Sequence, residues 1–272
     1  MSGHLRKMKS DLSDPVNYTL LLDETEIPLN NYIGREVSFH FSGEIHCQAC
    51  GRKTKKSYSQ GFCYPCSQKL AQCDLCIMRP ETCHYDNGTC REPQWGLEHC
   101  FQPHIVYLSN TSGLKVGITR QEQVPTRWID QGATQAIPMI SVTSRIHSGL
   151  LEVLFKEYVA DRTDWRKMLK GENSQIDLRA ERTRLLAGCA DGINKLGEQF
   201  GADSYQLLDS EVVNIGYPVN YYPEKVKSHN FDKSSNIGGL LQGIKGQYLI
   251  FDSGVINIRK FGGYLVSLSV PD

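Results

Sequence analysis

The residues with the clearest chemistry in this sequence are two pairs of cysteines with metal-ligand spacing. Cys47 and Cys50 form one C-x2-C pair, and Cys63 and Cys66 form another after twelve intervening residues. Each pair can bind one side of a tetrahedral Zn²⁺, and the intervening hairpin returns the chain for the second pair. We therefore predict a structural zinc site of the zinc ribbon or knuckle type. Four buried or disulfide-bonded cysteines are the disfavoured alternative, because the N-terminal residues lack the pattern of a signal peptide.

A second group of potential ligands follows directly. Nine of the ten cysteines lie between Cys47 and Cys100, and Cys73 and Cys76 repeat the C-x2-C spacing, which favours a second metal. The preferred ligands are Cys73, Cys76, Cys83 and Cys90. Cys100 and His104 are further candidates, His84 and His99 are alternatives, and the surplus also allows a third metal or unligated thiols. Closed sites of this kind are usually structural, because four protein ligands leave no position for water.

Basic side chains lie between the two knuckles of the first site. The segment RKTKKSYSQGF places Arg52, Lys53, Lys55 and Lys56 beside two aromatic residues. Such a segment suits contact with a phosphate backbone and unstacked bases, although a solvated hairpin tip can have the same composition. We predict nucleic acid as the partner of this segment and of Arg120.

Length and charge set limits on the class of protein. The chain has 272 residues, 40% of them hydrophobic, and 30 basic side chains balance 30 acidic ones. This length suits one large domain or about two to three small ones. Because the net charge is zero, any binding site for a polyanion must come from a local patch. No apolar run approaches the ~20 residues that a membrane helix needs, so we expect a cytoplasmic protein.

The block of residues 104–165 predicts the elements around a second candidate site. HIVYL and LKVGITR predict two strands joined by the turn SNTSG. Pro125 can open a short helix, PTRWIDQ. AIPMISVTSRI predicts a third strand that is interrupted at Pro138, and Ser148 can cap a helix that reaches about Tyr158.

The order of side chains in this block resembles the GIY-YIG nuclease superfamily. Its members carry a tyrosine on the first strand, Y/K-x-G on the second, an arginine on the first helix and a glutamate on the next. The matching residues here are Tyr107, Gly117, Arg127 and Glu152, with Lys115 in place of the second tyrosine, as in branches that carry K-I-G. The asparagine typical of the superfamily has no clear match, but Asp161 and Asp164 lie near its expected place. The match covers about sixty residues, and its motifs are short.

This resemblance implies metal-dependent cleavage of a phosphodiester bond. Glu152 would hold Mg²⁺, which would stabilise charge on the phosphate and the leaving oxygen. Arg127 would pair with the phosphate. Tyr107, or a water that it orients, would accept a proton, with its pKa lowered by Arg127, Lys115 or the metal. Gly117 would allow a close approach to the backbone.

Each of these residues also has a purely structural interpretation. Tyr107 could pack against Trp128, and Gly117 could relieve crowding between strands. Arg127 could pair with Asp130 at the surface. Glu152 could complement the N-terminus of its helix.

The wider sequence resembles an uncharacterised bacterial family, a domain of unknown function, in the strings CDLC, TCREP, KVGITR, PTRWIDQGA and GIKGQYLI. We predict an α+β fold. Strands in residues 1–45 should pair with strands in 202–272 and form a small OB-like barrel. Inserted in it are zinc knuckles at 46–104, a GIY-YIG-like domain at 105–170 and a long helix at 171–201.

The favoured function is that of a zinc-containing, Mg²⁺-dependent endonuclease acting on DNA or RNA. One alternative is a non-catalytic nucleic-acid-binding factor that keeps the fold, and another is a zinc-organised protein-interaction module. The nuclease requires Tyr107, Lys115, Arg127 and Glu152 to converge on one open cleft. The interaction module should show an apolar surface patch and no basic groove.

Overall fold

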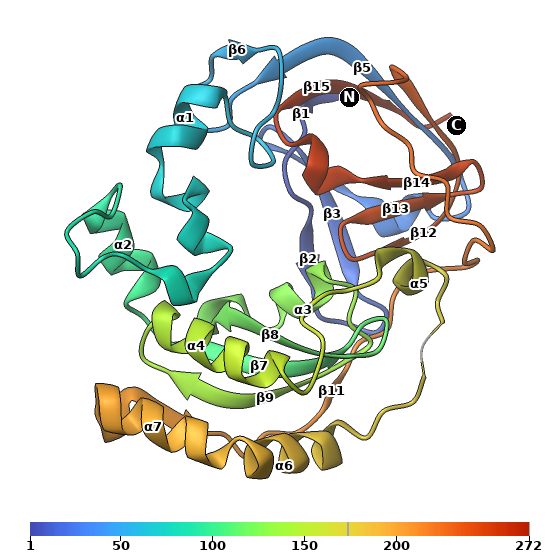
Figure 1. Ribbon diagram of the computed structural model, residues 1–272. Helices are drawn as coiled ribbons and strands as arrows, with labels where there is room; N and C mark the ends of the chain where they lie inside the picture. Colours follow the sequence, from blue (N-terminus) through green and yellow to red (C-terminus); the bar gives the residue numbers. More distant parts are fainter. Residues whose placement is uncertain (173, 272) are drawn as a thin grey trace.

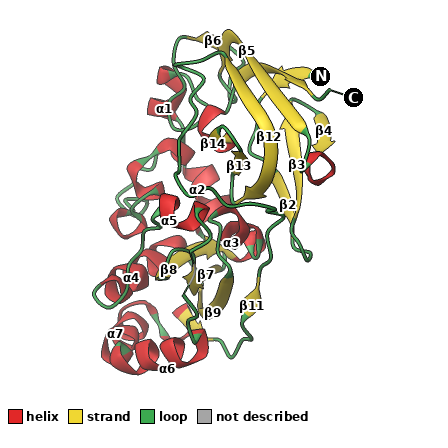
Figure 2. Ribbon diagram, turned by 90° about the vertical axis from the view of Figure 1, so that its right-hand side faces the viewer, coloured by secondary structure: helices red, strands yellow, loops and turns green. Residues whose placement is uncertain are grey.

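Three sheets make up the β structure of the protein. The computed structural model describes residues 1–172 and 174–271, and its strands form a seven-stranded, a five-stranded and a three-stranded sheet. The seven-stranded sheet and the five-stranded sheet lie at opposite ends of the molecule (Figure 2). The cysteine-rich residues form an arm between them, which we define as residues 47–103 (Figure 1).

Strands from both ends of the chain build the largest sheet. Its order is β1 (Ser2–His4), β15 (Tyr264–Ser269), β5 (Glu36–His46), β12 (Asn236–Lys245), β13 (Tyr248–Phe251) and β14 (Gly254–Asn257), with β6 (Lys53–Thr54) also on β5. All neighbours are antiparallel. Along β5 the apolar side chains of Val37 and Phe39 are buried, whereas Ser38 and His40 are exposed, because alternate residues of a strand face opposite sides. The predicted pairing of the two chain ends is confirmed.

The predicted closed barrel is wrong. A barrel needs a hydrogen-bonded ladder between its first and last strands, and among the described strands no ladder joins β1 to β14. Instead, β2 (Lys9–Asp11), β3 (Asn17–Leu22) and β4 (Thr25–Pro28) form a separate antiparallel sheet. The N-terminal strands are thus divided between two sheets and cannot close the larger one.

The central block forms the five-stranded sheet. Its order is β10 (Tyr205–Leu207), β9 (Gln135–Val142), β7 (His104–Asn110) and β8 (Leu114–Arg120), with β11 (Val213–Asn214) also on β9. The predicted hairpin is present as β7 and β8, and Tyr107 pairs with Gly117 across it. The register between β7 and β9 shifts where Tyr107 faces Pro138, since proline has no N–H for a regular ladder.

Helices cover this sheet and complete the hydrophobic cores. The helices of this part are α3 (Thr126–Asp130), α4 (Arg145–Lys156), α5 (Trp165–Leu169), α6 (Leu178–Gly188) and α7 (Ala190–Phe200). Leu151, Phe155, Leu185 and Ile193 from α4, α6 and α7 share one core with β7, β8 and β9. Tyr107 and Trp128 belong instead to the core that includes the larger sheet. The five-stranded sheet and α3 are therefore held against the rest of the molecule.

Two helix predictions need correction. Helix α4 begins at Arg145, and Ser148 lies inside it, where its hydroxyl donates to the carbonyl of Arg145 at 2.7 Å. The predicted long helix at 171–201 is divided at Cys189, whose φ of −109° and ψ of 11° separate α6 from α7. Gly201, at φ +95°, ends α7 as predicted.

The arm contains only short helical segments. These are α1 (Tyr64–Lys69), α2 (Pro93–Cys100) and 3-10 turns at Ala71–Cys73, Leu75–Ile77 and Pro80–Thr82. Further 3-10 turns outside the arm lie at Leu29–Tyr32, Gln121–Gln123, Ala202–Ser204 and Ile258–Phe261. The turn Pro80–Thr82 packs tightly on α4. A Cβ on Gly149 of this helix would lie only 2.6 Å from the backbone nitrogen of Glu81.

Candidate functional site

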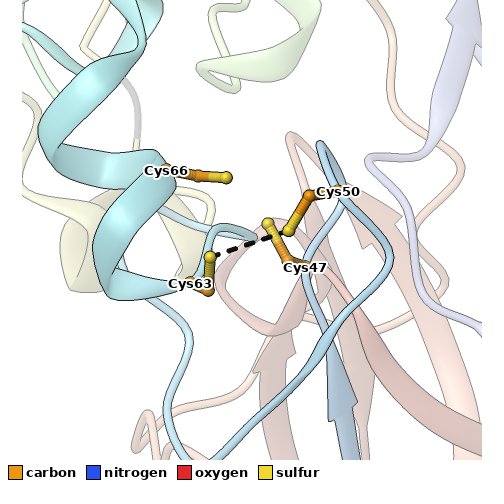
Figure 3. Close-up of side chains that lie close together, drawn as sticks. All are labelled: Cys47, Cys50, Cys63 and Cys66. Carbon is orange, nitrogen blue, oxygen red and sulfur yellow. Dashed lines mark hydrogen bonds between the residues drawn. The ribbon is translucent and has the colours of Figure 1, made fainter.

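The first four cysteines come together as their spacing predicts. The sulfur atoms of Cys47, Cys50, Cys63 and Cys66 all lie within 4.8 Å of one another, and those of Cys50 and Cys63 are 3.8 Å apart (Figure 3). Tetrahedral Zn²⁺ with ~2.3 Å bonds to sulfur requires sulfur–sulfur separations of about 3.8 Å. All ten cysteines are free thiols. The four residues therefore form a possible metal site that is compatible with zinc.

The knuckle turn after β5 prepares Cys47 for this role. Gly51 has φ +70°, and its N–H donates to the carbonyl of Cys47 at 2.8 Å, which closes the turn. Burial alone would raise the pKa of the Cys47 thiol, but hydrogen bonds from the backbone of Cys63, Cys50 and Ala49 outweigh it and lower the pKa to about 6. A zinc ligand must be a thiolate, and this turn stabilises that form.

The other cysteines of the arm are arranged differently from the predicted set. Cys76, Cys83 and Cys90 line one small cavity, and the fourth thiol there is Cys100. Cys73 lies outside this lining, near Ser59 and Arg91, because Asp74 and the turn that follows separate it from Cys76. Of the predicted set, the cavity thus brings Cys76, Cys83 and Cys90 together with Cys100 and leaves Cys73 outside.

His104 also lies outside the lining of this cavity. It is fully buried on β7, and its Nδ1 is 2.7 Å from the carbonyl oxygen of Gln102. Burial lowers the pKa of its imidazole to about 4. His104 thus belongs to the sheet and not to the cysteine cluster.

A cleft of about 270 Å³ collects most of the predicted catalytic residues. Lys115 and Gly117 reach it from β8, Arg127 from α3 and Glu152 from α4. The opposite wall is formed by the arm, through Ile77, Met78 and Pro80. The cleft therefore lies between the five-stranded sheet and the cysteine-rich arm.

Tyr107 lies directly beneath this cleft. Its side chain is fully buried, and its hydroxyl donates to Oε1 of Gln131 at 3.0 Å. A Cβ on Gly117 would lie 2.6 Å from the Tyr107 hydroxyl oxygen, so glycine at this position makes room for the ring. The rings of Tyr107 and Trp128 are 5.8 Å apart. Burial raises the pKa of Tyr107 to about 12.

Lys115 shares Gln131 with Tyr107. Its Nζ donates to the same Oε1 at 3.1 Å and lies 3.4 Å from the hydroxyl of Thr163. Burial, and then the positive charge of Arg127, lower the pKa of Lys115 to about 8. Burial at the cleft floor therefore favours the neutral amine of Lys115 more than water does.

Cations outnumber carboxylates in the cleft. Its cationic side chains are Lys115, Arg127, Arg145, Lys156 and Arg162, and its acidic ones are Glu152 and Asp161. Five positive groups against two negative ones leave an excess of three positive charges when all are ionised. Such an excess attracts polyanions even in a chain of zero net charge.

The two carboxylates are linked by one lysine. Nζ of Lys156 lies 3.5 Å from Glu152 and 3.1 Å from Asp161. Burial raises the pKa of Glu152, and Lys156 opposes this rise. Asp164, the other acid considered for this region, instead caps α5 by accepting hydrogen bonds from the N–H groups of Arg166 and Lys167.

The purely structural interpretation of Arg127 requires an ion pair with Asp130, but Asp130 has other partners. Its carboxylate pairs with Lys7 and accepts a hydrogen bond from Nε2 of Gln247 at 2.9 Å. Arg127 lines the cleft. Its guanidinium is thus placed where a ligand could reach it.

The basic hairpin lies apart from the cleft. Arg52, Lys53, Lys55 and Lys56 are exposed, and Lys53 pairs with Glu44 at 2.6 Å. Strand β6 in this hairpin and helix α4 lie at opposite ends of the arm (Figure 1). Arg120, at the end of β8, pairs with Glu122 at 3.0 Å. The structure therefore does not unite these predicted nucleic-acid contacts with the cleft.

Four polar residues of the cleft were not predicted, namely Gln131, Arg145, Lys156 and Arg162. Gln131 joins Tyr107 to Lys115, and Arg145 and Arg162 add positive charge. Gln131 could have been found from its place at the end of PTRWIDQ, on the helix that carries Arg127. No local pattern marks the two arginines, because only the packing of the arm against α4 brings a wall opposite them.

Within the described residues, no helix is both long enough and apolar enough to span a bilayer.

Comparison with known proteins places the chain in a family. No curated protein and no solved structure matches this chain. A family model described as a protein of unknown function (DUF2797) matches residues 34–266, a range that includes the arm, the cleft and most of the larger sheet. The chain therefore belongs to the DUF2797 family.

Proposed function

We propose that this protein is a metal-dependent endonuclease of the GIY-YIG type that cleaves phosphodiester bonds in DNA or RNA. The observation that carries the proposal is the convergence of Lys115, Arg127 and Glu152 on one cleft with an excess of positive charge. They come from three different elements, β8, α3 and α4, in the order expected from the sequence resemblance. Tyr107 supports the floor of the same cleft.

Binding of the substrate backbone would fall to the cationic side chains. The planar guanidinium of Arg127 can donate two parallel hydrogen bonds to a phosphate. Arg145 is held in place by a hydrogen bond from Nη2 to the carbonyl of Ile77 at 2.7 Å, so its guanidinium stays at the wall of the cleft. The cleft would receive a phosphate of the substrate backbone, whereas the basic hairpin could contact a more distant part of the strand.

The carboxylates suit a hard divalent cation. Glu152 and Asp161 offer oxygen ligands on the same cleft, and Mg²⁺ is commonly held by one or two carboxylates plus water and phosphate oxygens. A bound Mg²⁺ would stabilise negative charge on the phosphate and the leaving oxygen. Lys156, which pairs with both acids, would move aside and could then contact a neighbouring phosphate.

Proton transfer is assigned to Lys115. A general base works best when its pKa lies near the operating pH, and that of Lys115 is about 8. Tyr107 is fully buried, with a pKa of about 12. Its neutral hydroxyl donates a hydrogen bond to Gln131 and does not accept a proton. We assign Tyr107 the role of positioning Gln131, which in turn orients the amino group of Lys115.

A non-catalytic nucleic-acid-binding factor is the principal rival, because the cationic cleft would bind a backbone without cutting it. A mixed panel of labelled DNA and RNA, assayed for binding and cleavage with Mg²⁺ or Mn²⁺, separates the two. We expect wild-type cleavage, loss of cleavage with retained binding in Glu152→Gln, and normal activity in Glu157→Gln, an exposed acid at the end of the same helix. Binding without cleavage in all three proteins would establish the rival. Absence of both would favour a protein-interaction module.

A further inference from the structure

A small cavity inside the arm is lined by four cysteine side chains. It measures about 20 Å³ and lies between the 3-10 turns and α2. The four thiols are those of Cys76, Cys83, Cys90 and Cys100. A space of this size holds about one water-sized particle, so it suits a single ion and excludes an organic ligand.

The arm lacks the apolar core that would otherwise hold it together. Within residues 71–100, all of which are described, only Ala71, Pro80 and Gly96 are buried. Leu75 and Met78 are 62% and 79% exposed. A segment of about thirty residues with so little buried apolar surface needs a covalent or metal crosslink to keep one conformation.

We infer that Cys76, Cys83, Cys90 and Cys100 bind a second zinc ion, which fixes the arm and the cleft wall that it carries. The backbone brings these thiols together from three short elements. Cys76 lies in the turn Leu75–Ile77, Cys83 follows the turn Pro80–Thr82, and Cys100 ends α2. Helix α2 also packs beside Cys90, since a Cβ on Gly96 would lie in ordinary contact with its sulfur, at 3.5 Å.

Another combination of ligands lies in the same region. Single ligand atoms of Asp74, Cys76 and His84 are all within 4.8 Å of one another. However, the Asp74 carboxylate already pairs with Nε of Arg91 at 2.6 Å, and Nδ1 of His84 is 2.8 Å from the hydroxyl of Thr89. Four thiolates also satisfy tetrahedral Zn²⁺ completely. We therefore assign Asp74 and Arg91 to the surroundings of the site and not to the metal.

Zinc binding should contract the arm. Among the described residues, the four thiols do not form a group whose sulfur atoms all lie within 4.8 Å of one another, whereas tetrahedral ligation needs separations of about 3.8 Å. Ligation would thus draw the two turns and the end of α2 inward, and each thiol would release its proton to solvent.

The residues between Cys76 and Cys83 connect this site to the cleft. Ile77, Met78 and Pro80 line the cleft, the carbonyl of Ile77 accepts the hydrogen bond from Arg145, and Pro80 contacts α4 at Gly149. The ion would therefore stabilise one wall of the cleft from the side of that wall that faces away from the cleft. The metal assignment does not depend on the chemistry proposed for that cleft.

Zinc content and cobalt spectra of the full chain test the assignment. Mass spectrometry should find two zinc ions per chain in the wild type and in Cys73→Ser, the matched control, and also in His84→Gln. Cys83→Ser and Cys100→Ser should each retain one. A single zinc in the wild type would overturn the proposal. It would also be overturned if Cys73→Ser or His84→Gln lost the second zinc while Cys100→Ser retained it.

Cobalt substitution of the wild type decides the ligand set even where a cysteine variant fails to fold. Two tetrathiolate centres should give twice the sulfur-to-cobalt charge-transfer absorption per chain that one centre gives. A second centre with the weaker absorption of a mixed sulfur, nitrogen and oxygen site would contradict the four-thiol set.

Discussion

Gln131 is the residue on which the floor of the cleft depends. Its Oε1 accepts hydrogen bonds from both the Tyr107 hydroxyl and the Lys115 ammonium group. One amide oxygen thus fixes a buried phenol and the lysine side chain relative to each other. Four of the five residues taken from the sequence resemblance line the cleft themselves, and Tyr107 acts on it through this oxygen.

Lys115 gives the cleft a pH dependence. Burial lowers its pKa from 10.5 to about 8, so the fraction of Lys115 present as the free amine increases as pH rises through 8. We predict single-turnover cleavage that rises with pH and levels off above about 8, as expected for a general base. Lys115→Arg should lower the plateau by about 10²–10⁴-fold and remove this rise. An unchanged pH profile in Lys115→Arg would contradict the role.

The same shift affects stability with a definite sign. The folded pKa of Lys115 lies below its ordinary value, so the unfolded chain binds more protons between pH 8 and 10.5. Burial of the ammonium group therefore opposes folding below pH 8, and this contribution to the free energy of unfolding becomes more favourable as pH rises through that range.

Substitution of Gly117 tests whether this glycine of the motif makes room for the Tyr107 ring or for the substrate. A Cβ there would lie 2.6 Å from the Tyr107 hydroxyl oxygen, and the buried ring has little room to move. We predict that Gly117→Ala lowers the free energy of unfolding by about 1–3 kcal/mol, as overpacking usually does. Chemical denaturation measures this, with Gly188→Ala as a control, because no heavy atom lies within 4 Å of a Cβ at Gly188. Equal stability of Gly117→Ala and the wild type would show that Tyr107 does not need this space.

At the scale of elements, helix α4 carries both the chemistry and the contact with the arm. Glu152 faces the cleft, while Gly149, one turn earlier, lies against Pro80 and Glu81. This close contact sets the distance between the wall and the helix. The width of the cleft therefore depends on a residue that has no functional group.

Gly149→Ala should separate the arm from α4. The added Cβ would meet the backbone nitrogen of Glu81 and Cβ of Pro80, both at 2.6 Å, and backbone atoms cannot rotate away. We predict a loss of about 1–3 kcal/mol in stability and weaker binding of nucleic acid at unchanged zinc content. Fluorescence anisotropy with a labelled oligonucleotide measures the affinity. Wild-type affinity in a destabilised Gly149→Ala protein would mean that the arm does not contribute to the binding surface.

Local patterns predicted the elements of the cleft well. The strand-like strings HIVYL, LKVGITR and AIPMISVTSRI located β7, β8 and β9, and Pro138 marked the shift in register. The break at Cys189 was missed because the apolar residues of α6 and α7 keep a helical spacing across it. The predicted cap at Ser148 was also wrong, since α4 begins three residues earlier, after Ser144, whose side chain makes no capping hydrogen bond.

At the scale of the whole molecule, one buried side chain ties three distant parts together. Gln247 accepts a hydrogen bond from the N–H of Met8 at 2.9 Å and donates to the carbonyl of Met8 at 3.1 Å and to Asp130 at 2.9 Å. The N-terminal residues, α3 and the larger sheet meet there. The position of α3, and with it that of Arg127, thus depends on residues from both chain ends.

Gln247→Ala should loosen this junction. It would leave the buried polar groups of Met8 and Asp130 without their partner, which costs about 1–3 kcal/mol per group. We predict a lower free energy of unfolding and faster hydrogen exchange in α3. Gln242→Ala serves as a control on the neighbouring strand, since Gln242 is only half-buried. Wild-type exchange rates in α3 of Gln247→Ala would contradict the proposed coupling.

The global arrangement was predictable only in part. Pairing between the chain ends followed from the strand-like patterns left over at each end, but alternation within a strand does not reveal its neighbours. The division of β1–β4 between two sheets therefore went unseen. The spacing of the first four cysteines sufficed to bring them together, whereas the place of Cys100 in the lining of the small cavity depends on how α2 folds back over the turns.

Single-turnover cleavage by purified wild-type and Glu152→Gln proteins, with and without Mg²⁺, tests the central claim most directly. Both proteins should be prepared side by side with equal zinc content and shown to bind the same labelled substrate. We predict cleavage by the wild type only when Mg²⁺ is present, and a rate at least about 10²-fold lower for Glu152→Gln. Cleavage by both proteins at the same rate, or firm binding by the wild type without any cleavage, would contradict the account.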